Sequence, residues 1–124
     1  MNKSKPVIIL SSAFALALPA FADEPTKEQL DFFEGKIRPL LTEKCYKCHS
    51  QESGKSKGGL TLDLAAATLK GGDSGPGVVP GKPEESLIYK AIIYTDKDLA
   101  MPPSSSGGRL DAQQIADVPT RPPP

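Results

Sequence analysis

Bulky side chains and histidines are scarce in this sequence of 124 residues. It has no tryptophan, one histidine and two cysteines, and aromatic residues make up only 6% of it. An ordinary hydrophobic core would therefore be thin, and a cofactor or a partner would help to fill it. The 13 prolines and 11 glycines indicate long loops. A chain of this length excludes a multidomain enzyme, a large barrel and a long solenoid.

An excess of charge of either sign is also lacking, since 15 basic residues face 15 acidic ones. Without a basic excess the sequence gives no indication of nucleic-acid binding. No acid–base pair or nucleophile constellation indicates hydrolysis, and we expect no enzymatic activity. Four lysines surround the two cysteines, and they form either a docking patch for an acidic redox partner protein or a solvated polar face: Lys44, Lys47, Lys55 and Lys57.

No apolar run is long enough to cross a bilayer, which takes ~20 residues. The longest stretch, 7–18, follows Lys3 and Lys5 and precedes a small-x-small cleavage pattern that ends at Ala22. These features predict that residues 1–22 are a secretory signal peptide. We therefore expect a periplasmic or otherwise exported protein with no transmembrane span after cleavage. An uncleaved anchor or a buried helix is the alternative.

The segment after the signal has the spacing of an amphipathic helix. Thr26 is suited to cap its start, and apolar residues follow at helical spacing on one face: Leu30, Phe33, Ile37, Leu40 and Leu41. Pro39 lacks a backbone donor, and its ring crowds the carbonyl four residues back. We expect a kink or a break there, followed by a second short helical piece that leads into Cys45.

Three further helices are predicted. Asp63 is suited to cap a helix over 64–70, which Gly71 ends, and Pro83 suits the first turn of a helix over 83–93. Asp111 and Gln114 resemble a capping box for a helix that Pro119 soon stops. The segments 50–60, 71–82 and 94–109 are predicted loops. Because strand alternation is nearly absent, the expected fold class is all-α with long loops, formed by residues 23–118 and followed by a disordered Pro-rich tail at 119–124.

Both cysteines and the one histidine lie within five residues, as Cys45, Cys48 and His49. The spacing C-x-x-C-H is the attachment pattern of haem c. Two thiols separated by two residues on a helical turn are about as far apart as the two vinyl groups that become thioethers. The next residue, His49, is then carried under the macrocycle, where its imidazole can reach the iron.

Three other interpretations of the motif stay open from the sequence alone. A structural disulfide would use Cys45 and Cys48 and leave His49 without a role. A thioredoxin-like redox pair calls for a strand before it and a βαβ context, neither of which is found. A zinc site needs four ligands, and the motif offers three.

The sixth iron ligand is predicted to be Met101. A c-type iron with histidine on one face usually takes methionine or a second histidine on the other, and the sequence has no second histidine. Met101 is the only methionine left after signal removal, and Pro102 and Pro103 restrict its loop. A water-bound or open position, or a lysine ligand, is the alternative.

With these residues in place, the sequence resembles the planctomycete-type cytochrome c domain, a branch of the small c-type cytochromes. The resemblance is carried by FFEGKIRPLLTEKCYKCHS (32–50), KGGLTLD (57–63), LKGGDSGPGVVPGKPEESLIYKAI (69–92) and DLAMPP (98–103). It implies a compact helical haem-binding fold, electron transfer as the activity, one haem c on Cys45 and Cys48, His49 as the proximal ligand and Met101 as the distal one.

One departure from the family concerns the C-terminus. The segment 110–117 would continue into a full helix in the family, but here it meets a proline-rich stretch, so the C-terminal helix is expected to be truncated. The leading hypothesis is an exported monohaem c-type cytochrome that carries single electrons. The alternatives are an open-site haem protein with peroxidase-like or small-ligand-binding activity, and a truncated remnant of a longer multidomain haem protein.

Overall fold

The computed structural model describes residues 24–118, so the predicted signal peptide at 1–22 and the predicted tail at 119–124 lie outside the described residues. Most of the elements are short helices. In chain order they are α1 (Lys27–Phe32), the π-helix η1 (Phe33–Ile37), α2 (Arg38–Lys44), β1 (His49–Ser50), β2 (Lys55–Ser56), the 3-10 turn η2 (Lys57–Gly59), α3 (Ala65–Lys70), the 3-10 turn η3 (Pro83–Glu85), α4 (Leu87–Ile92), the 3-10 turn η4 (Ser104–Ser106) and α5 (Ala112–Asp117).

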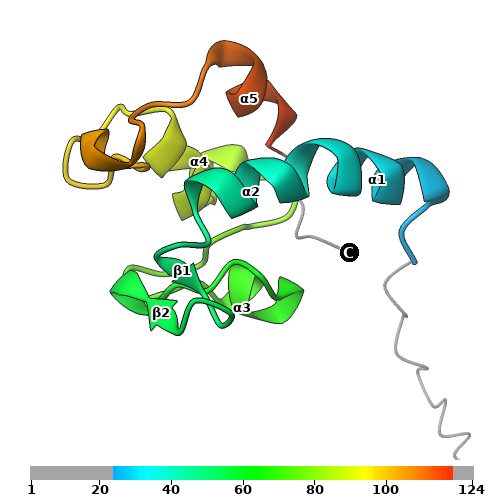
Figure 1. The fold of residues 1–124 in the computed structure, drawn as a ribbon, viewed down its shortest axis with the longest axis horizontal. Helices are drawn as coiled ribbons and strands as arrows, with labels where there is room; N and C mark the ends of the chain where they lie inside the picture. The colour runs from blue at the N-terminus through cyan, green and yellow to red at the C-terminus, as the bar shows by residue number, and fades with distance from the viewer. Residues whose placement is uncertain (1–23, 119–124) are drawn as a thin grey trace, which may run out of the picture.

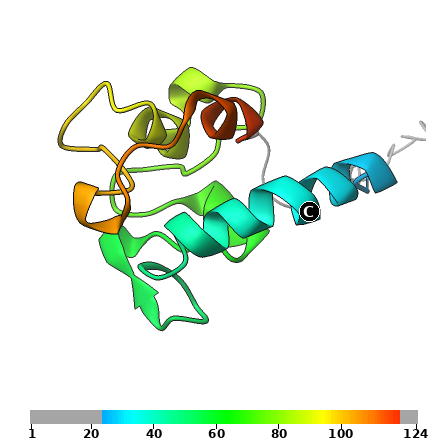
Figure 2. The ribbon, with the colours of Figure 1, turned by 45° about the horizontal axis from the view of Figure 1, so that its top comes forward.

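The helical rod formed by α1, η1 and α2 runs across the molecule (Figure 1). The hairpin β1–β2 and α3 lie on one side of this rod, and α4 and α5 lie on the other. Figure 2 shows that α1 extends beyond the rest of the fold, in keeping with the exposure of all its residues. Within residues 24–118 no helix is long and apolar enough to cross a membrane.

The start of the rod is capped as predicted. Thr26 and Gln29 form a reciprocal capping box, in which the Gln29 amide donates to Thr26 Oγ1 and the Thr26 amide donates to Gln29 Oε1. The expected interruption near Pro39 takes the form of the π-helical turn η1. Pro39 itself lies in the first turn of α2, where its missing donor costs little. Helical dihedral angles continue through Ile37, so the rod is not broken.

The expectation of a purely all-α fold was wrong in one detail, because β1 and β2 form an antiparallel hairpin. His49 pairs with Ser56, and Ser50 pairs with Lys55. Gly54 adopts a φ of 66° in the connecting turn, a conformation that favours glycine. Each strand has only two residues, which is too short to show the alternation that predicts a strand.

The predicted cap of the helix after residue 63 was also wrong. The helix α3 begins at Ala65 with Leu64 as its N-cap and no side-chain cap. The Asp63 carboxylate instead accepts hydrogen bonds from the backbone amides of Gln51 and Glu52, at 2.9–3.2 Å. Asp63 therefore closes the β1–β2 hairpin. The end of α3 at Gly71, which has a φ of 76°, is as predicted.

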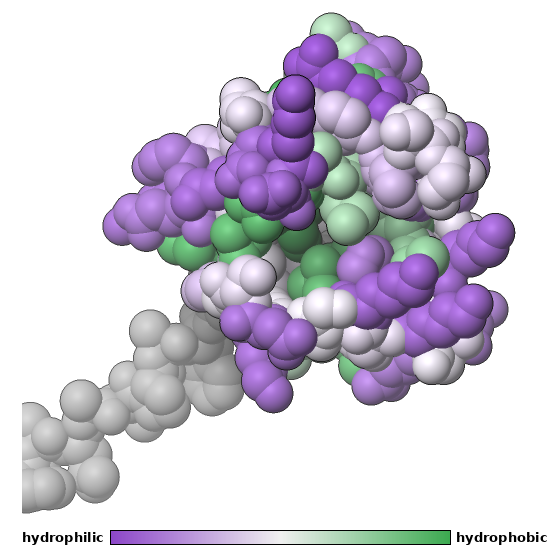
Figure 3. Space-filling model, turned by 90° about the vertical axis from the view of Figure 1, so that its left-hand side faces the viewer, coloured by the Kyte–Doolittle hydropathy of each residue, from purple (hydrophilic) through white to green (hydrophobic). Residues whose placement is uncertain are grey.

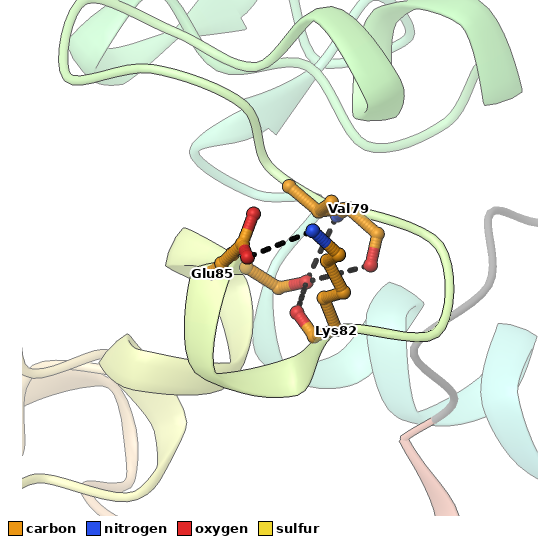
Figure 4. A network of polar contacts seen from close by, with 4 residues as sticks. Val79, Lys82 and Glu85 are labelled. Atoms are coloured by element: carbon orange, nitrogen blue, oxygen red, sulfur yellow. Dashed lines mark hydrogen bonds and ion pairs between the residues drawn. The ribbon is translucent and has the colours of Figure 1, made fainter.

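The single helix expected over 83–93 is divided by Ser86, whose backbone is extended (φ −85°, ψ 116°). Its buried hydroxyl accepts from the Val79 amide at 2.9 Å and donates to the Lys82 carbonyl at 2.8 Å (Figure 4). Serine hydroxyls compete with helix formation by bonding nearby backbone groups. The helix therefore starts at Leu87, and Ser86 fixes the preceding loop.

The centre of the core lies where α2, α4 and the segment before α5 meet. Leu40, Ile92 and Leu110 form a buried cluster, with four partly buried residues packed against it: Tyr89, Ile93, Ile115 and Val118. The capping box of Asp111 and Gln114 is present at the start of α5, as predicted. This helix has only six residues and ends at Asp117. The next residue, Val118, is extended, because a residue before proline avoids the helical region.

Candidate functional site

The Cys45–His49 motif forms a tight turn directly after α2. The Cys45 amide donates to the Leu41 carbonyl at 2.8 Å, which ties the motif to the last turn of the helix. The Cys45 carbonyl then accepts from the amides of Cys48, at 3.1 Å, and His49, at 3.0 Å. The two cysteines and the histidine are thus held within one turn, as the spacing predicted.

Both cysteines are free thiols and both are partly buried. Burial raises the pKa of the Cys45 thiol from 9.0 to about 11, so that this thiol is protonated near neutral pH. The structure therefore presents the pair as two unlinked sulfhydryl groups on one turn rather than as a disulfide.

The surroundings of the motif do not favour the two other interpretations. In the described part of the chain, the one sheet is the two-stranded antiparallel hairpin β1–β2, whereas a thioredoxin-like site needs a βαβ unit. Across residues 24–118, no group of three or more His, Cys, Asp or Glu side chains is arranged to hold a metal ion. A zinc site made by protein ligands alone is therefore not supported.

The imidazole of His49 is oriented by the backbone of Leu60. His49 Nδ1 lies 3.3 Å from the Leu60 carbonyl oxygen. Because a carbonyl oxygen can only accept, Nδ1 carries the proton, and the lone pair is on Nε2. This is the tautomer that binds a metal through Nε2. Leu60 is not among the residues predicted from the sequence, and no sequence signal marks it, since the contact uses a backbone atom eleven residues away.

Met101 is placed by a different part of the chain. Its side chain is 42% exposed, and its amide donates to the Ala91 carbonyl at 3.1 Å, near the end of α4. Tyr94 donates a hydrogen bond to the carbonyl oxygen of the buried Pro102, the residue after Met101. The loop of Met101 is thus attached to α4, and the pairing of Met101 with His49 across an iron stays a prediction.

The side of the molecule with the β1–β2 hairpin and the loop 94–109 has a hollow with a hydrophobic floor and a hydrophilic border (Figure 3).

Of the four lysines near the motif, Lys44 is partly buried and pairs with Glu43 at 2.7 Å. The others are exposed, and the Lys57 amide donates to the Cys48 carbonyl at 3.0 Å. Lys55 therefore lies in β2, the strand that pairs with β1, and Lys57 follows it.

The donor set fits a covalently attached haem. Two free thiols lie on one turn, and the neighbouring histidine has its Nδ1 proton engaged and its Nε2 lone pair available for iron. These are the groups that thioether attachment and axial ligation require.

Comparison with known proteins agrees with this fit. Residues 45–105 match the family model of planctomycete cytochrome C, a range that begins at Cys45 and includes Met101. No significant match was found among curated proteins or among solved structures. Through residues 45–105, this chain therefore belongs to the planctomycete cytochrome C family, whose cofactor is a haem of the c type.

Proposed function

We propose that this protein is an exported monohaem c-type cytochrome that carries single electrons between redox partner proteins. The observation that carries the proposal is the Cys45–His49 turn, in which two free thiols adjoin a histidine whose tautomer is fixed by the Leu60 carbonyl. The chain has two cysteines in all, which provides for one haem. Export is proposed from the signal-like residues 1–22.

Each residue of the motif has a distinct role in this proposal. Cys45 and Cys48 would hold the haem through thioether bonds, so that a small protein keeps a cofactor that it cannot enclose fully. His49 would bind the iron through Nε2, because Nδ1 donates to the Leu60 carbonyl. The haem, when bound, supplies a one-electron ferric–ferrous couple.

Met101 would be the second axial ligand. Its loop is attached to α4 through the Ala91 carbonyl and through the hydrogen bond from Tyr94 to Pro102, which lowers the entropy cost of holding the thioether in place. A thioether is a soft ligand that favours ferrous iron, so it raises the reduction potential relative to a second histidine. If His49 and Met101 both bind the iron, it would have no free position for substrate, and we propose electron transfer without enzymatic chemistry.

The exposure of Met101 favours one second candidate. Its side chain is 42% exposed in the structure, so the distal position is within reach of small molecules if the thioether does not bind. An open-site haem protein with peroxidase-like or small-ligand-binding activity would follow.

The proposal is tested by expression with the export and haem-attachment machinery, followed by a denaturing gel stained for haem. The processed wild type and Lys47→Ala, which alters the exposed residue between the cysteines, should both stain. Cys45→Ser with Cys48→Ser should not stain, because both thioether bonds are lost. A wild-type band at the processed mass that does not stain would overturn the proposal. The mass of the intact protein should show one haem per chain.

A further inference from the structure

The glycine-rich loop after α3 packs closely against the segment that orients His49. A Cβ atom at Gly72 would lie 2.2 Å from the Gly58 carbonyl oxygen and 3.0 Å from the Leu60 nitrogen. Real Cβ atoms do not approach backbone atoms this closely, so a larger residue would push the two segments apart. Gly72 is not among the residues with positive φ, so glycine is needed here for space rather than for dihedral freedom.

The loop is held against this segment by hydrogen bonds. The Asp73 amide donates to the Gly58 carbonyl at 2.8 Å. Gly72 and Gly75 exchange two backbone hydrogen bonds of 3.2 Å each, which close a four-residue turn with Asp73 at its second position. The contact is therefore made by a fixed turn.

The segment under this turn carries the carbonyl that accepts from His49. The Leu60 amide donates to the Lys57 carbonyl at 3.2 Å, and the Leu60 carbonyl oxygen lies 3.3 Å from His49 Nδ1. A displacement of Gly58 and of the Leu60 nitrogen is transmitted through one residue to that carbonyl. Gly72 is thus connected to the imidazole of His49 through the backbone of residues 58–60.

We propose that Gly72 and the Asp73 amide are positioning groups for His49. They hold the Gly58–Leu60 backbone where the Leu60 carbonyl oxygen accepts a hydrogen bond from Nδ1. This inference rests on the proposed function, because its readout needs a haem. A hydrogen bond from Nδ1 increases the donor strength of Nε2 and so favours ferric iron. Displacing the carbonyl weakens that bond and shifts the reduction potential upward.

The first test is Gly72→Ala in the haem-bearing protein, with Gly35→Ala as the matched control. A Cβ at Gly35 meets no atom within 4 Å. We expect Gly72→Ala to raise the ferrous-to-ferric ratio at a fixed applied potential about tenfold, which is a shift of about 59 mV for one electron. Gly35→Ala should keep the wild-type potential.

A second pair of variants tests the same idea at the hydrogen bond from the turn to Gly58, whose carbonyl oxygen the proline ring would also displace. Asp73→Pro removes the amide that bonds Gly58 and places proline at a turn position that favours it, whereas Asp73→Ala keeps the amide. Asp73→Pro should raise the potential in the same direction, and Asp73→Ala should not.

The outcomes separate this inference from the proposed function. Haem-bearing Gly72→Ala and Asp73→Pro proteins with the wild-type potential would overturn the inference and leave the cytochrome function standing. If neither variant retains haem, the exchange rate of the His49 Nδ1 proton in the wild-type holoprotein, measured by NMR, decides. Slow exchange supports the hydrogen bond, and exchange as fast as in free imidazole overturns the inference. A wild type without haem contradicts the proposed function itself.

Discussion

The hydroxyl of Tyr94 donates a hydrogen bond to the carbonyl oxygen of Pro102, the residue that follows Met101. Tyr94 lies two residues after the end of α4, and the Met101 amide is bonded to Ala91 within that helix. The loop is therefore joined to α4 at two points. The position of the Met101 side chain consequently depends on α4 as well as on its own flanking prolines.

Tyr94→Phe should loosen the loop of Met101. Removing a hydrogen bond of this kind costs about 1 kcal/mol, which corresponds to about a fivefold weaker hold on the thioether. If Met101 binds iron, added imidazole should therefore displace it about five times more readily, as measured by absorbance titration of the ferric protein. Tyr89→Phe, which alters a tyrosine packed on the core cluster, is the control and should titrate like wild type. Equal affinities in all three proteins would contradict this role of Tyr94.

Met101→Ala should change the ferric absorption spectrum and lower the reduction potential. Loss of the soft thioether removes the preference for ferrous iron, and we expect a change in the ferrous-to-ferric ratio of more than about tenfold at fixed potential. Leu64→Ala is a suitable control, because Leu64 is 45% exposed, close to the 42% of Met101. An unchanged spectrum in Met101→Ala would show that the sulfur does not bind iron and would favour the open-site candidate.

Ser86→Ala should destabilise the fold without changing the haem spectrum. The hydroxyl of Ser86 is buried and accepts from the Val79 amide, so its removal deprives that amide of this hydrogen bond. The Lys82 carbonyl also loses the hydroxyl but still accepts from the Glu85 amide. The expected loss is about 1–3 kcal/mol, with a fall in Tm of about 4–8 °C per kcal/mol. Thermal unfolding followed by circular dichroism measures it. The exposed Ser74 provides the control, and a Ser86→Ala protein as stable as Ser74→Ala would contradict the role of the hydroxyl.

Asp63→Asn should remove a part of the stability that depends on pH. Partial burial opposes the shift, but hydrogen bonds from the amides of Gln51 and Glu52 hold the pKa of Asp63 below its usual 3.8. Since the folded pKa is the lower one, the ionised form stabilises the folded state. This contribution is fully present above pH 3.8 and is lost as the pH falls through the folded value.

The measurement is the difference in free energy of unfolding between wild type and Asp63→Asn across this range. The difference should be constant near neutral pH and should shrink below pH 3.8. A difference that stays the same down to the acid limit would show that the charge of Asp63 does not hold the hairpin.

The sequence allowed the helix starts to be predicted where the capping group lies within three residues of its partner. Thr26 with Gln29 and Asp111 with Gln114 are such cases, and both capping boxes are present. The Asp63 carboxylate could serve the helix after it or the hairpin before it, and the sequence does not show which amides come near. It serves the hairpin, so the predicted cap was wrong.

In the site too, contacts within one turn were predictable and contacts between distant segments were not. Cys45, Cys48 and His49 lie together because they share one turn, and their spacing was enough to predict it. The contacts from Leu60 to His49 and from Gly72 to Gly58 join segments more than ten residues apart through backbone atoms. No residue type identifies such a contact. A glycine that is needed for space looks the same in a sequence as one that is needed for a turn.

The high pKa of the Cys45 thiol has a consequence for how the protein is assembled. A sulfhydryl that is shielded and protonated reacts slowly, since the thiolate is the reactive form. Bond formation at Cys45 is therefore faster on a chain that has not yet closed around it. We expect attachment of the haem to precede folding, so that the polypeptide folds around a porphyrin that it already carries.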